Sequence, residues 1–243
     1  EHDFGVSATV VDTGCHHEVI DVGDPDQPEA LGLAVDIGTS NVKAELVELA
    51  TGKILTGGSA LNAQVRYGED VISRIIYSQD KKDGAQQLQD AITQTVNGLI
   101  DDFLQDAGAE PEQIIAIACG GNATMISLRL QIPPDTIRRA PHIAPVCQPP
   151  IMCGEVLGLH THPRAAVFCL PAINGYVGGD ISAGILSTGM FQTNDLSLLI
   201  DVGTNGEIVL GSRDWMTCCS CSAGPAFEGM GIRCGLPARS GAI

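Results

Sequence analysis

Two stretches of the chain, LGLAVDIGTSNVKAE (31–45) and LLIDVGTNGEIVLG (198–211), share one unusual pattern. In each, an apolar run leads into Asp, a second apolar residue, Gly and Thr, and small polar residues then give way to another apolar run. Apolar runs interrupted by Gly and small polar residues predict a buried strand, a tight turn and a second strand. The repeat predicts a duplicated α/β unit.

Both turns have the composition of a phosphate site. A glycine turn lets backbone N–H groups approach a ligand closely, and a neighbouring Thr or Ser adds a hydroxyl donor. An Asp at the end of the incoming strand can hold a hydrated divalent cation such as Mg²⁺. One such turn alone is better interpreted as an ordinary hairpin, because the motif is short. Two of them in one chain favour a clamp for a polyphosphate and its metal.

Composition limits the partners. The chain has 243 residues, 44% of them hydrophobic, with 29 Gly and few aromatics, which is typical of a packed α/β protein with many tight turns. Its net charge is −16 and its 13 basic residues are scattered, so no nucleic-acid or membrane partner is expected. The same acidity means that a bound phosphate would need a metal cation beside it.

The cysteine content and the absence of targeting segments predict a cytoplasmic protein. No apolar run is long enough to span a membrane, and the start EHDFGVSATVV lacks the features of a signal peptide. Nine Cys in such a chain indicate free thiols in a reducing compartment. The chain begins without Met, which predicts that it is a fragment.

Three segments are expected. Residues 1–30 are polar and acidic and predict a linker or the end of a preceding segment. Residues 31–195 predict a first subdomain with a loop-rich insert, and residues 196–243 the incomplete start of a second. Expected strands cover 31–37, 42–49, 53–61, 114–119, 166–171, 196–202 and 207–210, and expected helices cover 83–108, 123–130 and 181–186.

Some polar residues outside the turns allow two interpretations. Asp180 precedes a helix of small residues, so it is either an N-cap or a functional acid placed one strand before the second turn. Arg66 and Arg74 either pair with Glu69 or Asp70 or face a ligand. The pair Cys218 and Cys221 is more simply explained by alternating buried thiols than by a metal centre, which needs four ligands.

The motifs also carry a family resemblance. DIGTSNVKAEL (36–46) and DVGTNGEIVL (201–210) resemble the first and second phosphate motifs of the acetate-and-sugar-kinase/heat-shock-70/actin superfamily. With SALNAQVRYGEDVISRI, CGGNATM, LPAINGYVGGD and CSAGPAFEGMGIRCG, the chain from residue 31 to its end resembles the reductive activators of corrinoid proteins. These ATP-dependent enzymes return an oxidised cobalamin protein from Co(II) to Co(I). The resemblance implies a ribonuclease-H-like, actin/heat-shock-70-type ATPase fold.

The resemblance also implies residue roles. Asp36 and Asp201 would hold Mg²⁺ mostly through water, and Asp180 would position the attacking water or the metal, so these three acids are the candidate catalytic residues. Phosphoryl transfer to water would then proceed mainly by positioning and charge neutralisation. The implied nucleotide-binding residues are Gly38, Thr39, Ser40, Asn41, Gly203, Thr204, Asn205 and Gly224.

The implied partners are ATP/ADP, a corrinoid protein and a second copy in a homodimer. A 2Fe–2S cluster is expected on a missing N-terminal segment, because the plant-type C-x₄-C-x₂-C run does not occur here. An adenosine-binding glycine turn is expected after Ile243. A small-molecule kinase of the same superfamily and a non-catalytic nucleotide-dependent assembly module are the alternatives. A P-loop is excluded because the only Gly-Lys pair, Gly52-Lys53, is followed by Ile.

Overall fold

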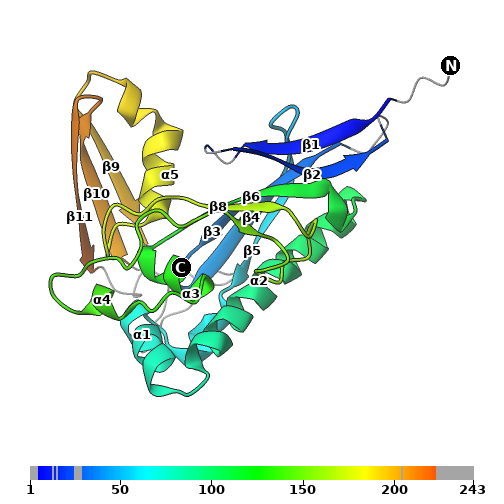
Figure 1. The fold of residues 1–243 in the computed structure, drawn as a ribbon. Coiled ribbons are helices and arrows are strands. Elements are labelled where there is room, and N and C mark those ends of the chain that lie inside the picture. The colour runs from blue at the N-terminus through cyan, green and yellow to red at the C-terminus, as the bar shows by residue number, and fades with distance from the viewer. Residues whose placement is uncertain (1–4, 13, 15, 25–28, 204, 223–243) are drawn as a thin grey trace, which may run out of the picture.

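The computed structural model describes residues 5–12, 14, 16–24, 29–203 and 205–222 (Figure 1). They form a six-stranded sheet, a three-stranded sheet and a separate two-stranded hairpin. Helix α5 lies beside the three-stranded sheet, and helix α2 runs along the six-stranded sheet (Figure 1). Within these ranges every helix is too short or too polar to cross a lipid bilayer.

The six-stranded sheet has the order β5-β4-β3-β6-β8-β7. It begins with the expected antiparallel meander, and two further strands run parallel to β3, as a crossover through helices requires. A short antiparallel strand closes the far edge. The strands are β3 (Leu31–Ile37), β4 (Asn41–Glu48), β5 (Ile54–Leu61), β6 (Ile114–Gly121), β7 (Met152–Cys153) and β8 (Ala166–Cys169).

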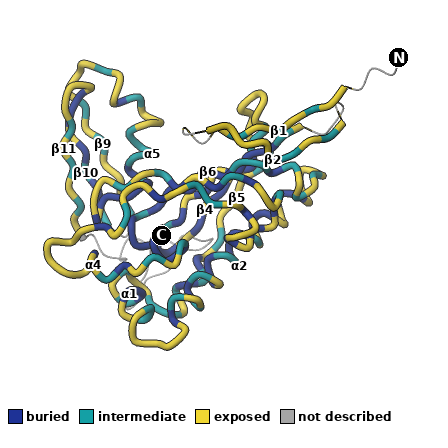
Figure 2. The backbone as a smooth tube through the Cα atoms, viewed as in Figure 1, coloured by how far each residue is buried: buried dark blue, intermediate teal, exposed yellow. Residues whose placement is uncertain are grey.

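Helix α2 (Gly84–Ala107) forms the main core with one face of this sheet. Its buried residues recur at helical spacing, including Leu88, Ile92, Val96 and Ile100, and they pack on the alternate buried residues of β3 and β4. Figure 2 shows buried backbone concentrated where α2 faces the sheet. The expected helix 83–108 is therefore confirmed, and it ends at Gly108 in the left-handed region, as helices commonly do.

Helix α1 (Val71–Asp80) was not among the expected helices. Its start is fixed by a capping box: Ser73 N donates to Asp70 Oδ1 at 2.7 Å, and Asp70 N donates to Ser73 Oγ at 3.2 Å. The remaining helices of this region are η1 (Ala63–Tyr67), η2 (Pro111–Gln113), α3 (Ala123–Arg129) and α4 (Asp135–Arg138). From residue 131 to 165 most of the chain is loop, as expected.

The three-stranded sheet restarts the meander pattern, in the order β11-β10-β9. A small second core, made by Val177, Ile181, Met190 and Val209, joins it to α5. Because α5 also packs against β6, this helix links the two sheets. The elements are α5 (Gly179–Thr188), η3 (Met190–Gln192), β9 (Ser197–Val202), β10 (Asn205–Ser212) and β11 (Trp215–Ser222).

The N-terminal region holds the antiparallel hairpin β1 (Ser7–Asp12) and β2 (His17–Gly23), where sequence composition indicated a linker or the end of a preceding segment. Alternation within SATVVD and HEVIDVG supports strands although both flanks are acidic. Ile20 is buried, and Arg164 Nη2 donates to Glu18 Oε1 at 2.7 Å. The hairpin is thereby anchored to the loop before β8.

Candidate functional site

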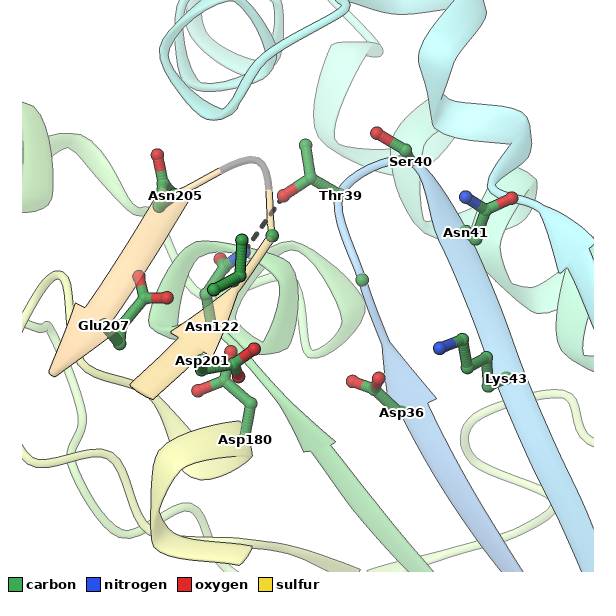
Figure 3. Close-up of a pocket in the computed structure, with 13 residues that line it drawn as sticks. Asp36, Thr39, Ser40, Asn41, Lys43, Asn122, Asp180, Asp201, Asn205 and Glu207 are labelled. Atoms are coloured by element: carbon green, nitrogen blue, oxygen red, sulfur yellow. Dashed lines mark hydrogen bonds between the residues drawn. The ribbon is translucent and has the colours of Figure 1, made fainter. Parts of the chain in front are cut away.

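Residues of both Asp-x-Gly-Thr turns, which begin at Asp36 and Asp201, line one cleft of about 260 Å³ (Figure 3). The turn between β3 and β4 forms one wall, and the turn between β9 and β10 faces it, with the start of α5 below. The cleft gathers predicted residues from segments far apart in the sequence. Its described lining is Asp36, Gly38, Thr39, Ser40, Asn41, Lys43, Asn122, Asp180, Asp201, Val202, Gly203, Asn205 and Glu207.

Two predicted nucleotide-binding residues, Thr204 and Gly224, lie outside the described residues. The other predicted residues of both turns line the cleft. Four further lining residues, Lys43, Asn122, Val202 and Glu207, were not predicted. Lys43 lies two positions after Asn41 in β4, and Glu207 lies two positions after Asn205 in β10. Side chains two positions apart on a strand point to the same face, so this spacing could have indicated that both residues reach the cleft.

The first turn is tight because Gly38 has no side chain. A Cβ there would lie 2.5 Å from the carbonyl oxygen of Asn41, so no other residue fits without moving the backbone. Thr39 and Ser40 are largely buried in the turn, and both line the cleft. Asn122 Nδ2 donates to Thr39 Oγ1 at 3.2 Å, shown as the dashed line in Figure 3, and so ties the end of β6 to the turn.

The second turn carries two acids on neighbouring strands. Asp201 of β9 and Glu207 of β10 are register partners across the antiparallel pair. The turn is closed by a hydrogen bond from Gly203 N to Asn205 O at 3.0 Å. Glu207 is buried and accepts a hydrogen bond from Ser220 Oγ at 2.9 Å, which holds its carboxylate in place.

Asp180 reaches the cleft because two glycines allow a close approach of backbones. A Cβ on Gly178 would lie 2.4 Å from Asn122 Cα, and one on Gly179 would lie 2.6 Å from Leu170 O. The N-cap of α5 is Gly178, and Asp180 lies within the first helical turn. The N-cap interpretation of Asp180 is therefore wrong, and its carboxylate Oδ1 instead accepts from Ile181 N at 2.8 Å.

Burial and neighbouring carboxylates raise the pKa of three acids in the cleft. Burial raises the pKa of Asp180 to about 6, with further contributions from the charges of Asp36 and Asp201. Partial desolvation also raises the pKa of Asp36, which the ammonium of Lys43 opposes and the charge of Asp201 increases. Desolvation and the charges of Asp180 and Asp201 raise the pKa of Glu207. Such a cluster favours a cation.

The donor set fits Mg²⁺ held partly by water. Its side chains are carboxylates, the hard oxygen ligands that Mg²⁺ prefers. Across the described part of the chain, no three His, Cys, Asp or Glu side chains converge closely enough to hold a metal ion by themselves.

The two arginines have different environments. Arg66 is stacked on the ring of Tyr67, with 4.8 Å from its guanidinium carbon to the ring centroid. Arg74 is wholly buried, and among the described residues no carboxylate oxygen lies within ion-pair distance of it. It donates to the carbonyl oxygen of Thr39 at 2.6 Å, so it contacts the first turn from behind rather than facing the cleft.

The cysteines of β11 do not form an alternating buried set. Cys218 is partly buried, whereas Cys219 and Cys221 are exposed, because β11 is an edge strand of the described sheet. Cys221 donates from Sγ to Gly206 O at 3.3 Å. The expectation of buried alternation is therefore wrong for this strand.

Comparisons with known proteins identify relatives. The family model described as the RACo middle region matches residues 31–193, and the model for the C-terminal domain of RACo, the ASKHA domain, matches residues 195–243. "Corrinoid activation enzyme RamQ" of Eubacterium limosum is 34% identical over 87% of this chain and 35% of its own length. A reductase of Methanosarcina barkeri named for a methylated amine-specific corrinoid protein is 27% identical, over 87% of this chain and 40% of its own length.

A solved structure agrees with these matches. The "Reductive activator for corrinoid,iron-sulfur protein" superposes with a TM-score of 0.92 at 40% identity, covering 98% of this chain and 38% of that chain. The chain thus spans between a third and two fifths of the length of these relatives. The chain belongs to the RACo family and has the actin/heat-shock-70-like fold of ASKHA proteins.

Proposed function

We propose that this chain supplies the ATP-hydrolysing part of a reductive activator, which returns a corrinoid protein from Co(II) to Co(I). The observation that carries the proposal is the meeting of both Asp-Gly-Thr turns and Asp180 at one cleft. The family and the names of its relatives support a role in corrinoid activation. Among the described residues that line the cleft, none favours a small-molecule kinase or a non-catalytic assembly module over this function.

Each turn would bind phosphate oxygens through its backbone amides and hydroxyl groups. Thr39, Ser40 and Asn41 would contact one part of the polyphosphate, and Gly203, Thr204 and Asn205 another. The ammonium of Lys43 would offset part of the acidic field. Gly224 stays a predicted nucleotide-binding residue and lies beyond the described residues.

Asp36 and Asp201 would hold Mg²⁺ mostly through its water shell. The ion would neutralise the charge that develops on the transferring phosphoryl group. Burial and the charge of Asp201 raise the pKa of Asp36, and a bound cation would favour its ionised carboxylate.

Asp180 would orient the attacking water. With a pKa of about 6 its carboxylate is mostly ionised at neutral pH and accepts a hydrogen bond from that water. The water oxygen forms the new bond to the γ-phosphorus as the bond to the β,γ-bridging oxygen breaks, giving ADP and phosphate. The helix N-terminus behind Asp180 adds a positive dipole end close to the phosphates.

The electron needed for the reduction is proposed to come from a 2Fe–2S cluster on another segment of the full-length protein. Nucleotide state would change the fit to the corrinoid protein and thereby the ligation of its cobalt, which is a coupling free energy between two sites. A homodimer in the cytoplasm is the expected working state.

The test uses the full-length protein with a Co(II) corrinoid protein and an electron donor. We expect ATP hydrolysis to accelerate on adding the Co(II) protein, and Co(I) absorbance to rise only when ATP is present. A rate of ATP hydrolysis that does not change on adding the corrinoid protein, together with Co(I) formation without ATP, would contradict the proposal. Equal affinity for the Co(II) protein with ATP and with ADP would contradict the coupling.

A further inference from the structure

Three wholly buried polar residues, Asn62, Gln64 and Arg74, lie directly behind the first phosphate turn. We call them the bracket. All three belong to the stretch SALNAQVRYGEDVISRI, and none of them lines the cleft. Burying a polar side chain without a partner is costly, so each buried group is expected to have a hydrogen-bond partner.

The bracket holds three successive carbonyl oxygens of the turn. Asn62 Nδ2 donates to Gly38 O at 2.8 Å, and Arg74 Nη2 donates to Thr39 O at 2.6 Å. The backbone N–H of Asn62 donates to Ser40 O at 2.9 Å. Asn62 and Arg74 therefore donate a hydrogen bond to each carbonyl oxygen from Gly38 to Ser40.

The bracket is itself anchored to the helices around it. Arg74 Nη1 donates to Gln64 Oε1 at 3.3 Å, and Gln64 Nε2 donates to Leu88 O of α2 at 2.8 Å. Arg74 Nε donates to Gly68 O at 2.9 Å. Among the described side chains no buried nitrogen or oxygen lacks a partner. A satisfied buried network of this kind is rigid.

Fixing the carbonyls also fixes the amides. In a planar trans peptide the C=O and the following N–H point in opposite directions. With the carbonyls of Gly38, Thr39 and Ser40 turned toward the bracket, the N–H groups of Thr39, Ser40 and Asn41 are turned away from it, toward the cleft. The guanidinium charge of Arg74 also polarises the Thr39 peptide, which strengthens its donor side.

We propose that Asn62 and Arg74 are positioning residues that aim the amides of the first turn at the phosphates of the nucleotide. The inference rests on the proposed function for its ligand, and on the bracket's own hydrogen bonds for its geometry. Neither residue lines the cleft, so both would act through the turn.

The chain offers a matched control in Arg129. It is also buried, on α3, and it donates to Thr93 Oγ1 at 3.0 Å and to Leu157 O at 2.9 Å, without contacting either turn. Arg74→Met and Arg129→Met therefore each remove one buried guanidinium. Both variants should lower the melting temperature of the full-length protein by similar amounts.

Only the change at Arg74 should affect nucleotide binding. We expect Arg74→Met to raise KM for ATP about tenfold or more, the scale of a lost charge-assisted hydrogen bond, while Arg129→Met leaves KM unchanged. Arg74→Lys keeps a charged donor and should recover part of the affinity. Asn62→Ala should raise KM in the same direction. Equal KM values in Arg74→Met and Arg129→Met would overturn the proposal.

A second measurement needs no nucleotide. The amide of Asn62 is protected by Ser40 O, so its hydrogen exchange reports opening of the turn. Exchange at this amide should be faster in Arg74→Met than in Arg129→Met when both have lost equal stability, and equal rates would overturn the inference. If wild-type protein binds no ATP but this difference is present, the proposed function fails and the positioning of the turn stands.

Discussion

Asp36 and Lys43 are register partners across β3 and β4, and both side chains line the cleft (Figure 3). The ammonium of Lys43 lowers the pKa of Asp36, against the opposing effects of desolvation and of Asp201. Lys43 alone carries a positive charge among the described residues that line the cleft. It is therefore the side chain that most directly offsets the charge of four carboxylates.

Replacing Lys43 by Met should raise KM for ATP about tenfold, because the phosphates would meet the acids without a compensating ammonium. Hydrolysis assays of the full-length protein over a range of ATP concentrations measure this. Lys53, an exposed lysine before β5 and outside the cleft, provides the control, and Lys53→Met should leave KM unchanged. Equal KM values for ATP in Lys43→Met and Lys53→Met would show that Lys43 has no role in nucleotide binding.

Asp201→Ala should reduce corrinoid-stimulated ATP hydrolysis by about 100-fold or more, since it removes a carboxylate that the proposal assigns to the metal. The exposed Asp195, just before β9, is the matched control, and Asp195→Ala should retain full stimulation. Unchanged circular dichroism in both variants would show that the fold survives. A normal rate in Asp201→Ala would exclude Asp201 from the mechanism.

Asp180 should make the free protein less stable as the pH rises. Its pKa is about 6 in the folded protein and near its usual 3.8 in the unfolded chain, so between these values the folded state holds a proton that the unfolded chain has lost. Stability therefore falls as the pH rises through this window, and the loss is complete above it.

Asp180→Asn should consequently stabilise the nucleotide-free, chelator-treated protein by about 1–3 kcal/mol near neutral pH. The gain should shrink as the pH falls and vanish well below 3.8, where both states of the wild type are protonated. Thermal unfolding at both pH values measures it, and hydrolysis by the same variant should be lost. A variant less stable than wild type at neutral pH would contradict the assignment.

Gly178→Ala should destabilise the protein by about 1–3 kcal/mol, because its Cβ would collide with the backbone of Asn122. The backbone shift that relieves this collision would also displace Asp180 and lower the rate of ATP hydrolysis. Gly98 in the middle of α2 has open space around its Cβ position, so Gly98→Ala should be neutral or slightly stabilising. Urea unfolding of both variants measures the contrast, and a neutral Gly178→Ala would contradict the contact.

The sequence predicted elements whose patterns are local. The meander 31–61 and the helix α2 follow from hydrophobic period and turn residues. The same local pattern singles out Asp36 and Asp201, whose roles in metal binding and catalysis stay predictions. Helix α1 was missed although Asp70 and Ser73 form a capping box, because it is only 10 residues long and its buried residues include the charged Arg74.

What sequence could not supply were contacts between distant segments. Arg74 lies 35 positions from Thr39, and no local rule connects a guanidinium to that carbonyl. Likewise Asn122 reaches Thr39 only because β6 pairs in parallel with β3. The hairpin β1–β2 was missed because acidic flanks outweighed the short alternation in its strands.

Because of the bracket, the first turn loses its conformational entropy during folding rather than during ligand binding. Ordering a glycine turn at the moment of ligand binding reduces affinity, whereas a turn already fixed by Asn62 and Arg74 has lost that freedom during folding. Nucleotide association would then involve no ordering step at residues 38–41. The stability of the folded chain and the proposed affinity for nucleotide would thereby be linked through two residues that do not line the cleft.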